Sequence, residues 1–227
     1  MAFDRGLLDR AGATGRPFLR LYRFAPSCLS LGRNQPTARY DRAEIARLGC
    51  DVVRRPTGGG AVWHEHDVTY AVAAPIAVFG GLRAAYGAIQ ARLAAALRAL
   101  GVEAVLAPAR ASGRRPDWSG SCFATAVGGE VVVGGRKLIG SAQVRHGHAF
   151  LQHGSILLDG SQEIVRLVSG AAGGGETTLR SLLGRPVAFA EVASAIVDTW
   201  GVTRPLTARP ADGLTAAFRD PTWTWRR

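Results

Sequence analysis

The sequence predicts an α+β domain in which helices flank a mixed, largely antiparallel sheet. Three observations support this fold class: strand-like segments outnumber helical ones, several of them follow each other as hairpins would, and one long segment repeats its apolar residues at helical spacing. The chain has 227 residues and 47% of them are hydrophobic, so it can bury one core. We therefore expect a single domain over residues 1–227, with an irregular tail from about residue 203 to 227.

The first third of the chain alternates short helices with short strands. Apolar residues at helical spacing predict helices over residues 1–10 and 40–48, and Gly49 ends the second helix. Alternating or continuous apolar residues between turn signals predict strands over 18–24, 28–32, 50–55, 61–64 and 68–74. We expect the last two of these strands to be antiparallel neighbours.

The clearest helix covers residues 82–100, because its leucine, tyrosine and isoleucine residues recur at steps of three and four and Gly101 supplies a stop. A Pro-, Gly-, Arg- and Ser-rich loop is expected over 108–121, and Gly134-Gly135 predicts the turn of a β-hairpin over 130–140. The remaining expected elements are strands at 103–107 and within 148–158, a glycine-rich break at 170–175, and helices at 178–183 and 191–200.

The chain is strongly basic and obtains its positive charge almost entirely from arginine. It has 28 Lys and Arg residues against 17 Asp and Glu, a formal net charge of +11, and its one lysine is Lys137. The use of Arg for Lys is typical of a G+C-rich coding bias, whereas the excess of cations favours encounter with acidic partners. The cations are scattered without a basic tract or interleaved aromatic residues, so the pattern does not favour nucleic-acid binding.

Composition also restricts the cellular setting. The uncharged stretches are interrupted well before the length of a membrane span, and the first ten residues contain acidic residues and no apolar signal core. The three cysteines, Cys28, Cys50 and Cys122, have no CxxC spacing, which argues against a disulfide scaffold or a zinc knuckle. We expect a cytoplasmic protein without a membrane segment.

The run Thr57-Gly58-Gly59-Gly60 is the first candidate site. Glycines that follow a strand let the backbone approach a ligand closely and aim its N–H groups into a pocket. The run lacks the Gly-Lys-Ser/Thr of a phosphate-binding loop and the GxGxxG of a dinucleotide fold. A hairpin with a flexible glycine turn is the alternative interpretation.

Cys122 and Lys137 are the second and third candidates. Cys122 lies in a polar, Arg-flanked loop, where nearby cations and N–H groups favour the reactive thiolate, although an inert loop cysteine is the alternative. Lys137 lies in the expected hairpin, where a compact ammonium can reach a carbonyl or phosphoryl oxygen. The alternative, an ordinary exposed lysine, is disfavoured because the chain uses arginine at every other basic position.

The histidines fit a metal site poorly. His64 and His66 flank Glu65, and His146 and His148 flank Gly147, so each pair alternates along one strand. Such pairs can bind zinc, but no cysteine ligand or HExxH pattern accompanies them. His153 lies within an apolar strand, so the simplest interpretation is a buried core histidine with satisfied hydrogen bonds rather than a metal ligand.

Taken together, these segments resemble the catalytic domain shared by lipoate–protein ligases, biotin–protein ligases and octanoyltransferases. The resemblance covers about residues 1–200 and rests on motifs in the family's order: Met1–Asp4, Leu29–Gln35, Arg54–His64 with Thr69-Tyr70, Gly135–Gln143 and Leu151–Leu158. It implies a mixed sheet flanked by helices, with the glycine run and Lys137 lining one acyl pocket.

Within this family, the sequence is most similar to octanoyltransferases of the LipM type. Their pattern places Cys-Phe eight residues before the Glu that opens the lysine hairpin, as Cys122-Phe123 and Glu130 do here. Lipoate ligases carry an Asn-Asp pair where this chain has Gly129-Glu130, and the arginine-glycine loop of biotin ligases is not seen. Two positions depart from the transferase pattern: Gly60, where Arg is usual and ligases have Gly, and 124–126, where a Pro-Ser element is usual.

The resemblance implies an acyltransferase of lipoate biosynthesis. It would move an octanoyl group from octanoyl-acyl-carrier protein to the lysine of a lipoyl domain or of glycine-cleavage H protein, through a thioester on Cys122. Two alternatives stay open: an ATP-dependent lipoate–protein ligase that forms a lipoyl-adenylate, and a non-catalytic acyl- or nucleic-acid-binding module on the same fold.

The resemblance also assigns the site residues. The catalytic set would be Cys122, Lys137, which would stabilise the oxyanion, and His64, which would assist proton transfer. The substrate-binding set would be Arg55, Thr57, Gly58, Gly59, Gly60, Ala61, Gly140, Ser141, Ala142, Gln143, His153 and Gly154. No metal or other cofactor is expected, and neither is a nucleic-acid partner. We expect the protein to act as a monomer.

Overall fold

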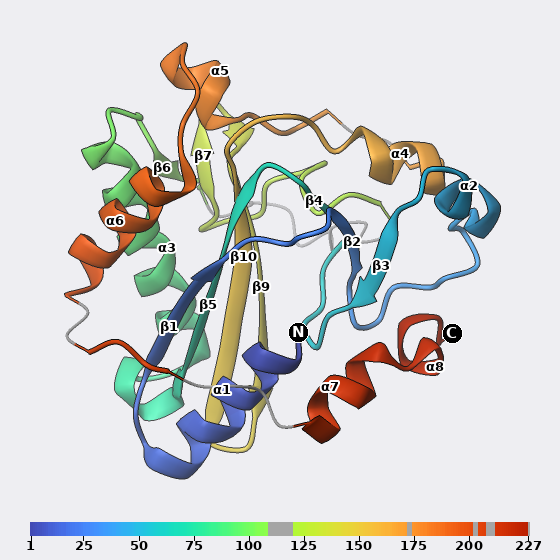
Figure 1. Cartoon of the computed structure of the whole chain (residues 1–227). Coiled ribbons are helices and arrows are strands. Elements are labelled where there is room, and N and C mark those ends of the chain that lie inside the picture. The colour runs from blue at the N-terminus through green and yellow to red at the C-terminus, as the bar shows by residue number, and fades with distance from the viewer. Residues whose placement is uncertain (109–119, 172–173, 202–203, 208–211, 227) are drawn as a thin grey trace.

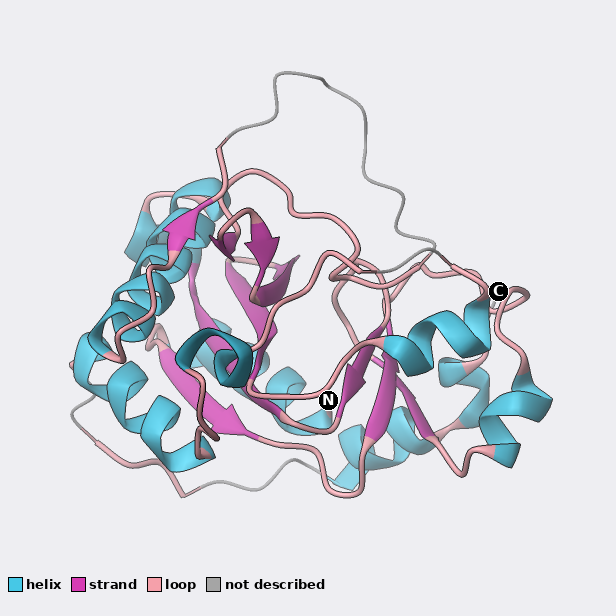
Figure 2. Ribbon diagram, turned by 90° about the horizontal axis from the view of Figure 1, so that it is seen from above, coloured by secondary structure: helices cyan, strands magenta, loops and turns pink. Residues whose placement is uncertain are grey.

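The structure is a computed structural model that describes residues 1–108, 120–171, 174–201, 204–207 and 212–226 (Figure 1). Within these residues the strands form three sheets, and the central one has the order β1-β5-β10-β9. Viewed from above, the strands occupy the interior and most helices lie at the periphery (Figure 2). The loop expected over 108–121 falls mostly outside the described residues.

The central sheet is antiparallel throughout. It comprises β1 (Phe18–Tyr22), β5 (Asp67–Pro75), β10 (Ala149–Leu157) and β9 (Ile139–His146). The side chains of β5 alternate between its two faces, as a pleated strand requires. Val68, Tyr70, Val72 and Ala74 join the core on one face, whereas Ala71 and Ala73 join a second core on the other.

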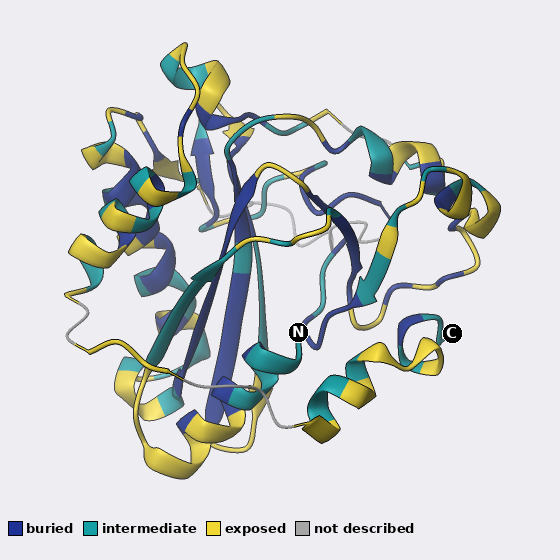
Figure 3. Cartoon of the chain, in the orientation of Figure 1, coloured by how far each residue is buried: buried dark blue, intermediate teal, exposed yellow. Residues whose placement is uncertain are grey.

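Helices cover both faces of this sheet, which is why β5 and β10 are almost entirely buried (Figure 3). The long helix α3 (Leu82–Ala99) and α6 (Phe189–Trp200) pack on the face of Val68, and α1 (Ala2–Thr14) packs on the opposite face through Leu7 and Leu8. Each fully buried leucine contributes about 1.5–3 kcal/mol of hydrophobic stabilisation.

A second sheet has the order β3-β2-β4, with β2 (Cys28–Leu31) parallel to β3 (Asp51–Arg54) and antiparallel to β4 (Val62–His64). Helices α2 (Arg42–Arg47) and α4 (Glu163–Ser169) cover its apolar side. This sheet presents the glycine run, residues 57–60, toward the central sheet, since the ideal Cβ of Gly59 lies 3.9 Å from that of Ala142.

The third sheet contains the lysine hairpin. β7 (Val131–Val133) pairs with β6 (Val105–Leu106) on one side and with β8 (Arg136–Lys137) on the other. The remaining short helices are η1 (Ile76–Phe79), α5 (Leu179–Leu183), α7 (Asp212–Arg219) and α8 (Pro221–Thr224). The expected turn at Gly134-Gly135 is confirmed, and both glycines have positive φ.

The expected fold class is confirmed, but three local expectations differ from the structure. The expected pairing of strand 61–64 with 68–74 is wrong, because β4 pairs with β2 whereas β5 lies between β1 and β10. Residues 163–169 form a helix that the sequence pattern did not indicate. Residues 212–224, expected to be irregular, form α7 and α8, and tertiary contacts stabilise such short helices.

Candidate active site

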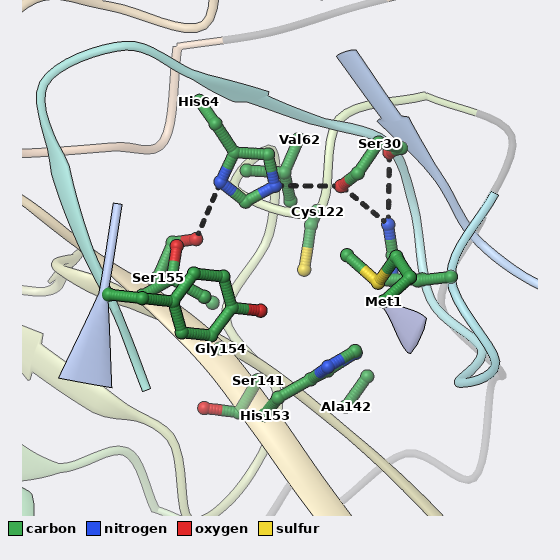
Figure 4. A pocket seen from close by; sticks show the side chains of 14 residues that line it. Met1, Ser30, Val62, His64, Cys122, Ser141, Ala142, His153, Gly154 and Ser155 are labelled. Atoms are coloured by element: carbon green, nitrogen blue, oxygen red, sulfur yellow. Dashed lines mark hydrogen bonds between the residues drawn. The ribbon is translucent and has the colours of Figure 1, made fainter. Parts of the chain in front are cut away.

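A pocket lies between the central sheet and the β3-β2-β4 sheet and contains Cys122 in its wall (Figure 4). It encloses about 320 Å³, including space open to solvent. Its lining residues are Met1, Tyr22, Ser30, Arg55, Val62, His64, Thr69, Cys122, Gly140, Ser141, Ala142, His153, Gly154 and Ser155.

Backbone pairing with the glycine run fixes the position of Cys122. The Cys122 N–H donates to the Ala61 carbonyl at 2.8 Å, and the Ala61 N–H donates to the Gly120 carbonyl at 2.9 Å. A Cβ on Gly60 would overlap the Gly120 carbonyl oxygen and would lie 2.8 Å from the Cys122 nitrogen. Gly60, one of the two departures from the transferase pattern, is therefore required for this close approach.

The sulfur of Cys122 points into the pocket, and Figure 4 shows it between His64 and Ser30 on one side and Ser141 on the other. Gly140 of β9 leaves room for it, because a Cβ there would lie only 3.2 Å from the sulfur. Cys122 is 4% exposed, so only groups that enter the pocket can reach its thiol.

Lys137 lies behind Cys122 and is fully buried. Its ammonium donates to the Cys122 carbonyl oxygen at 2.7 Å and to the Glu130 carboxylate at 2.8 Å, and it lies 3.9 Å from the Cys122 sulfur. Burial raises the pKa of Glu130, and the neighbouring charge of Lys137 opposes that rise. We expected Lys137 to line the pocket, but its ammonium is directed at the backbone and sulfur of Cys122 instead.

Arg55 supplies a second buried cation, and unlike Lys137 it lines the pocket. Its guanidinium donates to the carbonyls of Gly58, Gly60 and Ser30, and among the described residues it has no carboxylate partner. Burial lowers its pKa, and negative charge on Cys122 opposes that change. Arg55 therefore both shapes the glycine run and adds positive potential near the sulfur.

His64 is held on both sides of its ring. Its Nε2 lies 2.8 Å from the Ser30 hydroxyl, and its Nδ1 lies 2.8 Å from Asp67 Oδ2 and 3.2 Å from the Ser155 hydroxyl. The ring of Phe24 stacks on the imidazole, with centroids 4.2 Å apart. Because His64 is 4% exposed, these contacts determine its orientation.

His153 belongs to a different buried network. Its Nε2 lies 2.5 Å from the Thr57 hydroxyl, and its Nδ1 lies 3.3 Å from Asp4 Oδ2. Arg20 and Tyr22 also donate to the Asp4 carboxylate, each at 2.7 Å. Burial lowers the pKa of His153, although Asp4 opposes that change. The network thus connects α1 and β1 to the glycine run.

The small residues of β9 and β10 form the floor of the pocket. Ser155 lies opposite Gly140, Gly154 opposite Ser141, and His153 opposite Ala142 in the strand register. The Ser141 hydroxyl contacts the hydroxyl of Tyr70 and the amide of Gln90, both at 2.7 Å. A Cβ on Gly154 would overlap the Gly140 carbonyl oxygen, so only glycine fits at this position of β10 beside β9.

The structure brings together most of the residues that the sequence indicated. Eight of them line the pocket: Arg55, His64, Cys122, Gly140, Ser141, Ala142, His153 and Gly154. Thr57, Gly58, Gly59, Gly60 and Ala61 support it from behind, as Lys137 does. Gln143 lies elsewhere, because its amide donates to the Leu82 carbonyl and to Gln152.

The sequence did not single out Ser30, Asp67 or Ser155, which surround His64. The sequence did contain a signal for Ser30. A polar residue between Leu29 and Leu31 in a buried strand needs a hydrogen-bond partner. Glu130 was noted only for its spacing, not as the partner of Lys137.

Two further properties concern the described part of the chain. None of its helices combines the length and apolar character that a membrane span needs. Over the same residues, His, Cys, Asp and Glu side chains nowhere gather in threes or more in a way that could hold a metal ion.

Comparison with known proteins agrees with this geometry. Residues 1–201 match the family described as the lipoyl protein ligase A/B catalytic domain. An octanoyltransferase LipM of Moorella thermoacetica is 42% identical over 165 residues, which are 70% of this chain and 60% of that protein. A second LipM, of Symbiobacterium thermophilum, is 36% identical over 231 residues, covering 92% of this chain and 83% of the relative. The chain thus matches about 60% of the length of the first relative.

Solved structures share the fold at lower identity. A lipoate-protein ligase A bound with ATP superposes with a TM-score of 0.78 and 18% identity, covering 99% of this chain and 92% of that one. A bipartite lipoate protein ligase of Thermoplasma acidophilum gives a TM-score of 0.72 at 18% identity, covering 99% and 89%. The fold, the motif order and the family match agree. The chain belongs to the lipoyl protein ligase A/B catalytic-domain family.

Proposed function

We propose that this protein is an octanoyltransferase of lipoate biosynthesis that carries the acyl group on Cys122. The observation that carries the proposal is the position of the Cys122 sulfur, which points into a pocket with the buried cations of Lys137 and Arg55 nearby. The similarity to LipM octanoyltransferases, at 36–42% identity, supports the same reaction.

The chemistry has two halves. In the first, the Cys122 thiolate attacks the carbonyl carbon of a donor thioester; the new C–S bond forms, the donor C–S bond breaks, and the donor leaves as a thiolate that takes a proton from water. In the second, an acceptor lysine amine attacks the carbonyl carbon on Cys122, so that an amide forms and the thiolate is released. Lys137, 3.9 Å from the sulfur, stabilises negative charge on the sulfur and on the oxygen of the tetrahedral intermediate.

The proposed donor is octanoyl-acyl-carrier protein, and the proposed acceptor is a lipoyl domain or glycine-cleavage H protein. The formal net charge of +11 favours encounter with acidic proteins of this kind. Charge steering is weakened by salt, so the second-order rate constant should fall as ionic strength rises. A rate independent of salt would contradict this part of the proposal.

The Cys122→Ser variant tests the reaction. Serine has nearly the same shape but is a much weaker nucleophile, so octanoyl transfer from the acyl-carrier protein to a lipoyl domain should be abolished. Undiminished transfer would exclude the covalent route. Lipoate-dependent exchange between ATP and pyrophosphate, which a ligase requires and a transferase does not, would favour the ligase reaction instead.

A further inference from the structure

The second half-reaction needs a proton acceptor. The acceptor lysine is an ammonium at neutral pH and cannot attack a thioester until it loses a proton. Lys137 is poorly placed for that task, because its ammonium is already held by Glu130 and by the Cys122 carbonyl behind the pocket wall. Two buried imidazoles line the pocket, His64 and His153. The nitrogens of His153 contact Thr57 and Asp4, neither of which lines the pocket, whereas Nε2 of His64 contacts the hydroxyl of Ser30, which does.

The contacts around His64 fix which nitrogen is basic. Arg55 donates to the Ser30 hydroxyl oxygen at 3.3 Å, so the Ser30 hydroxyl directs its own hydrogen to His64 Nε2, 2.8 Å away. Nδ1 then carries the ring hydrogen and donates it to Asp67 Oδ2, also at 2.8 Å. This tautomer leaves the lone pair of Nε2 on the side of the ring that faces Ser30 and the pocket (Figure 4).

Asp67 is built to stay ionised behind the imidazole. It is 3% exposed, and Thr69 donates to the same Oδ2 at 2.9 Å, which holds the carboxylate in place. Burial opposes ionisation, but His64 and the hydrogen bonds from His64, Ser155 and Thr69 outweigh it and lower the pKa of Asp67. An ionised carboxylate in this position stabilises the imidazolium that forms when Nε2 accepts a proton.

We propose that Ser30, His64 and Asp67 form a proton relay that activates the acceptor lysine. The inference rests on the proposed octanoyl transfer; it assigns Ser30 as the hydroxyl that passes the proton to His64, and Asp67 as a positioning residue that acts through His64. The relay serves the second half-reaction, in which an ammonium must be deprotonated. It is dispensable for the first, in which the Cys122 thiolate is the nucleophile.

The protons balance in three steps. The lysine ammonium gives one proton to the Ser30 hydroxyl as Ser30 passes its own proton to His64 Nε2. The neutral amine then attacks the carbonyl carbon; the C–N bond forms, the C–S bond breaks, Cys122 leaves as the thiolate, and the second amine proton goes to water. The imidazolium returns its proton to water, so the net products are the amide, the Cys122 thiolate and two released protons.

The Asp67→Asn variant tests the relay when each half-reaction is followed separately. Acylation of Cys122 by octanoyl-acyl-carrier protein, followed by intact mass, should proceed at the wild-type rate. Transfer from the acyl-enzyme to a lipoyl-domain lysine should slow by about 100-fold or more, the usual range for a lost proton acceptor. Hydroxylamine is neutral at neutral pH and needs no such acceptor, so it should cleave the acyl-enzyme at the wild-type rate.

The matched control is Asp159→Asn, which makes the same chemical change at an exposed carboxylate paired with Arg180. Both half-reactions should be unchanged in it. Ser30→Ala should give the same result as Asp67→Asn, with unchanged acylation of Cys122 and slowed transfer to lysine. It serves as the test if Asp67→Asn does not fold. Unslowed transfer to lysine, or equal slowing with lysine and hydroxylamine, would overturn the relay. A wild-type enzyme that forms no acyl-enzyme would instead overturn the proposed octanoyl transfer.

Discussion

The ammonium of Lys137 contacts both carboxylate oxygens of Glu130, at 2.8 Å from Oε1 and 2.7 Å from Oε2, and the two side chains are 0% and 1% exposed. The same ammonium donates to the carbonyl of Cys122. A buried ion pair therefore fixes the backbone of the proposed nucleophile. Removing one member of such a pair leaves an uncompensated buried charge, which is strongly destabilising.

The Glu130→Gln variant should lose about 3–5 kcal/mol of unfolding free energy, because Lys137 would stay buried without its counter-charge. Urea denaturation measures this loss. A Glu130→Gln/Lys137→Met double variant removes both charges and should recover part of the stability without recovering octanoyl transfer. If Glu130→Gln is as stable as the wild type, the ion pair does not fix the site.

The Lys137→Arg variant keeps the positive charge but changes its shape. Lys137 is fully buried, and a planar guanidinium cannot contact Glu130, the Cys122 carbonyl and the sulfur region as the compact ammonium does. Single-turnover acylation of Cys122 should fall by about 100-fold or more, the usual effect of disturbing a preorganised group that stabilises developing negative charge. Near-normal acylation would show that any buried charge suffices.

The Gly60→Ala variant tests the contact between the glycine run and the Cys122 loop. The added Cβ would overlap the Gly120 carbonyl, so the loop that carries Cys122 must shift. We expect the unfolding free energy to fall by about 1–3 kcal/mol. Acylation of Cys122 should also slow. Gly58→Ala is the matched control for stability, because nothing lies within 4 Å of a Cβ there. Equal unfolding free energies of the two variants would contradict the close approach.

Acid should destabilise the protein through Asp4. Burial disfavours ionisation of its carboxylate, but the hydrogen bond with His153 and the charges of His153 and Arg20 outweigh it and lower its pKa below the ordinary 3.8. The ionised carboxylate therefore contributes stability above about pH 4, and the contribution is lost as the pH falls below that value.

Unfolding free energies measured against pH check this expectation. Asp4→Asn should be less stable than the wild type at neutral pH and should lose less stability on acidification below about pH 4. Asp9→Asn, on the exposed side of the same helix, is the control and should keep the wild-type slope. Parallel curves for Asp4→Asn and the wild type would contradict the assignment.

Local sequence patterns were sufficient for much of the fold. The helical spacing over residues 82–100 and the Gly134-Gly135 turn depend on neighbouring residues alone, and both are confirmed. The partner of residues 61–64 depends on contacts between distant segments, which periodicity does not encode, and that expectation was wrong. The helix at 212–219 was missed because short helices depend on tertiary packing.

The same distinction applies to the site. Cys122, Lys137 and the glycine run lie in motifs that can be recognised along the chain. Two of the partners of His64 cannot, because Ser30 is 34 residues away on another strand and Ser155 is 91 residues away. Only the folded chain shows that Lys137 is paired with Glu130, and that Arg55 is the buried cation in the pocket wall.

Intact mass spectrometry of the protein mixed with octanoyl-acyl-carrier protein, in the absence of an acceptor, tests the central claim most directly. The account predicts that the protein gains the mass of one octanoyl group, that peptide mapping places this group on Cys122, and that adding a lipoyl domain removes it as that domain becomes octanoylated. An unmodified protein that nevertheless transfers octanoyl to the lipoyl domain, or an adduct on another residue, would contradict it.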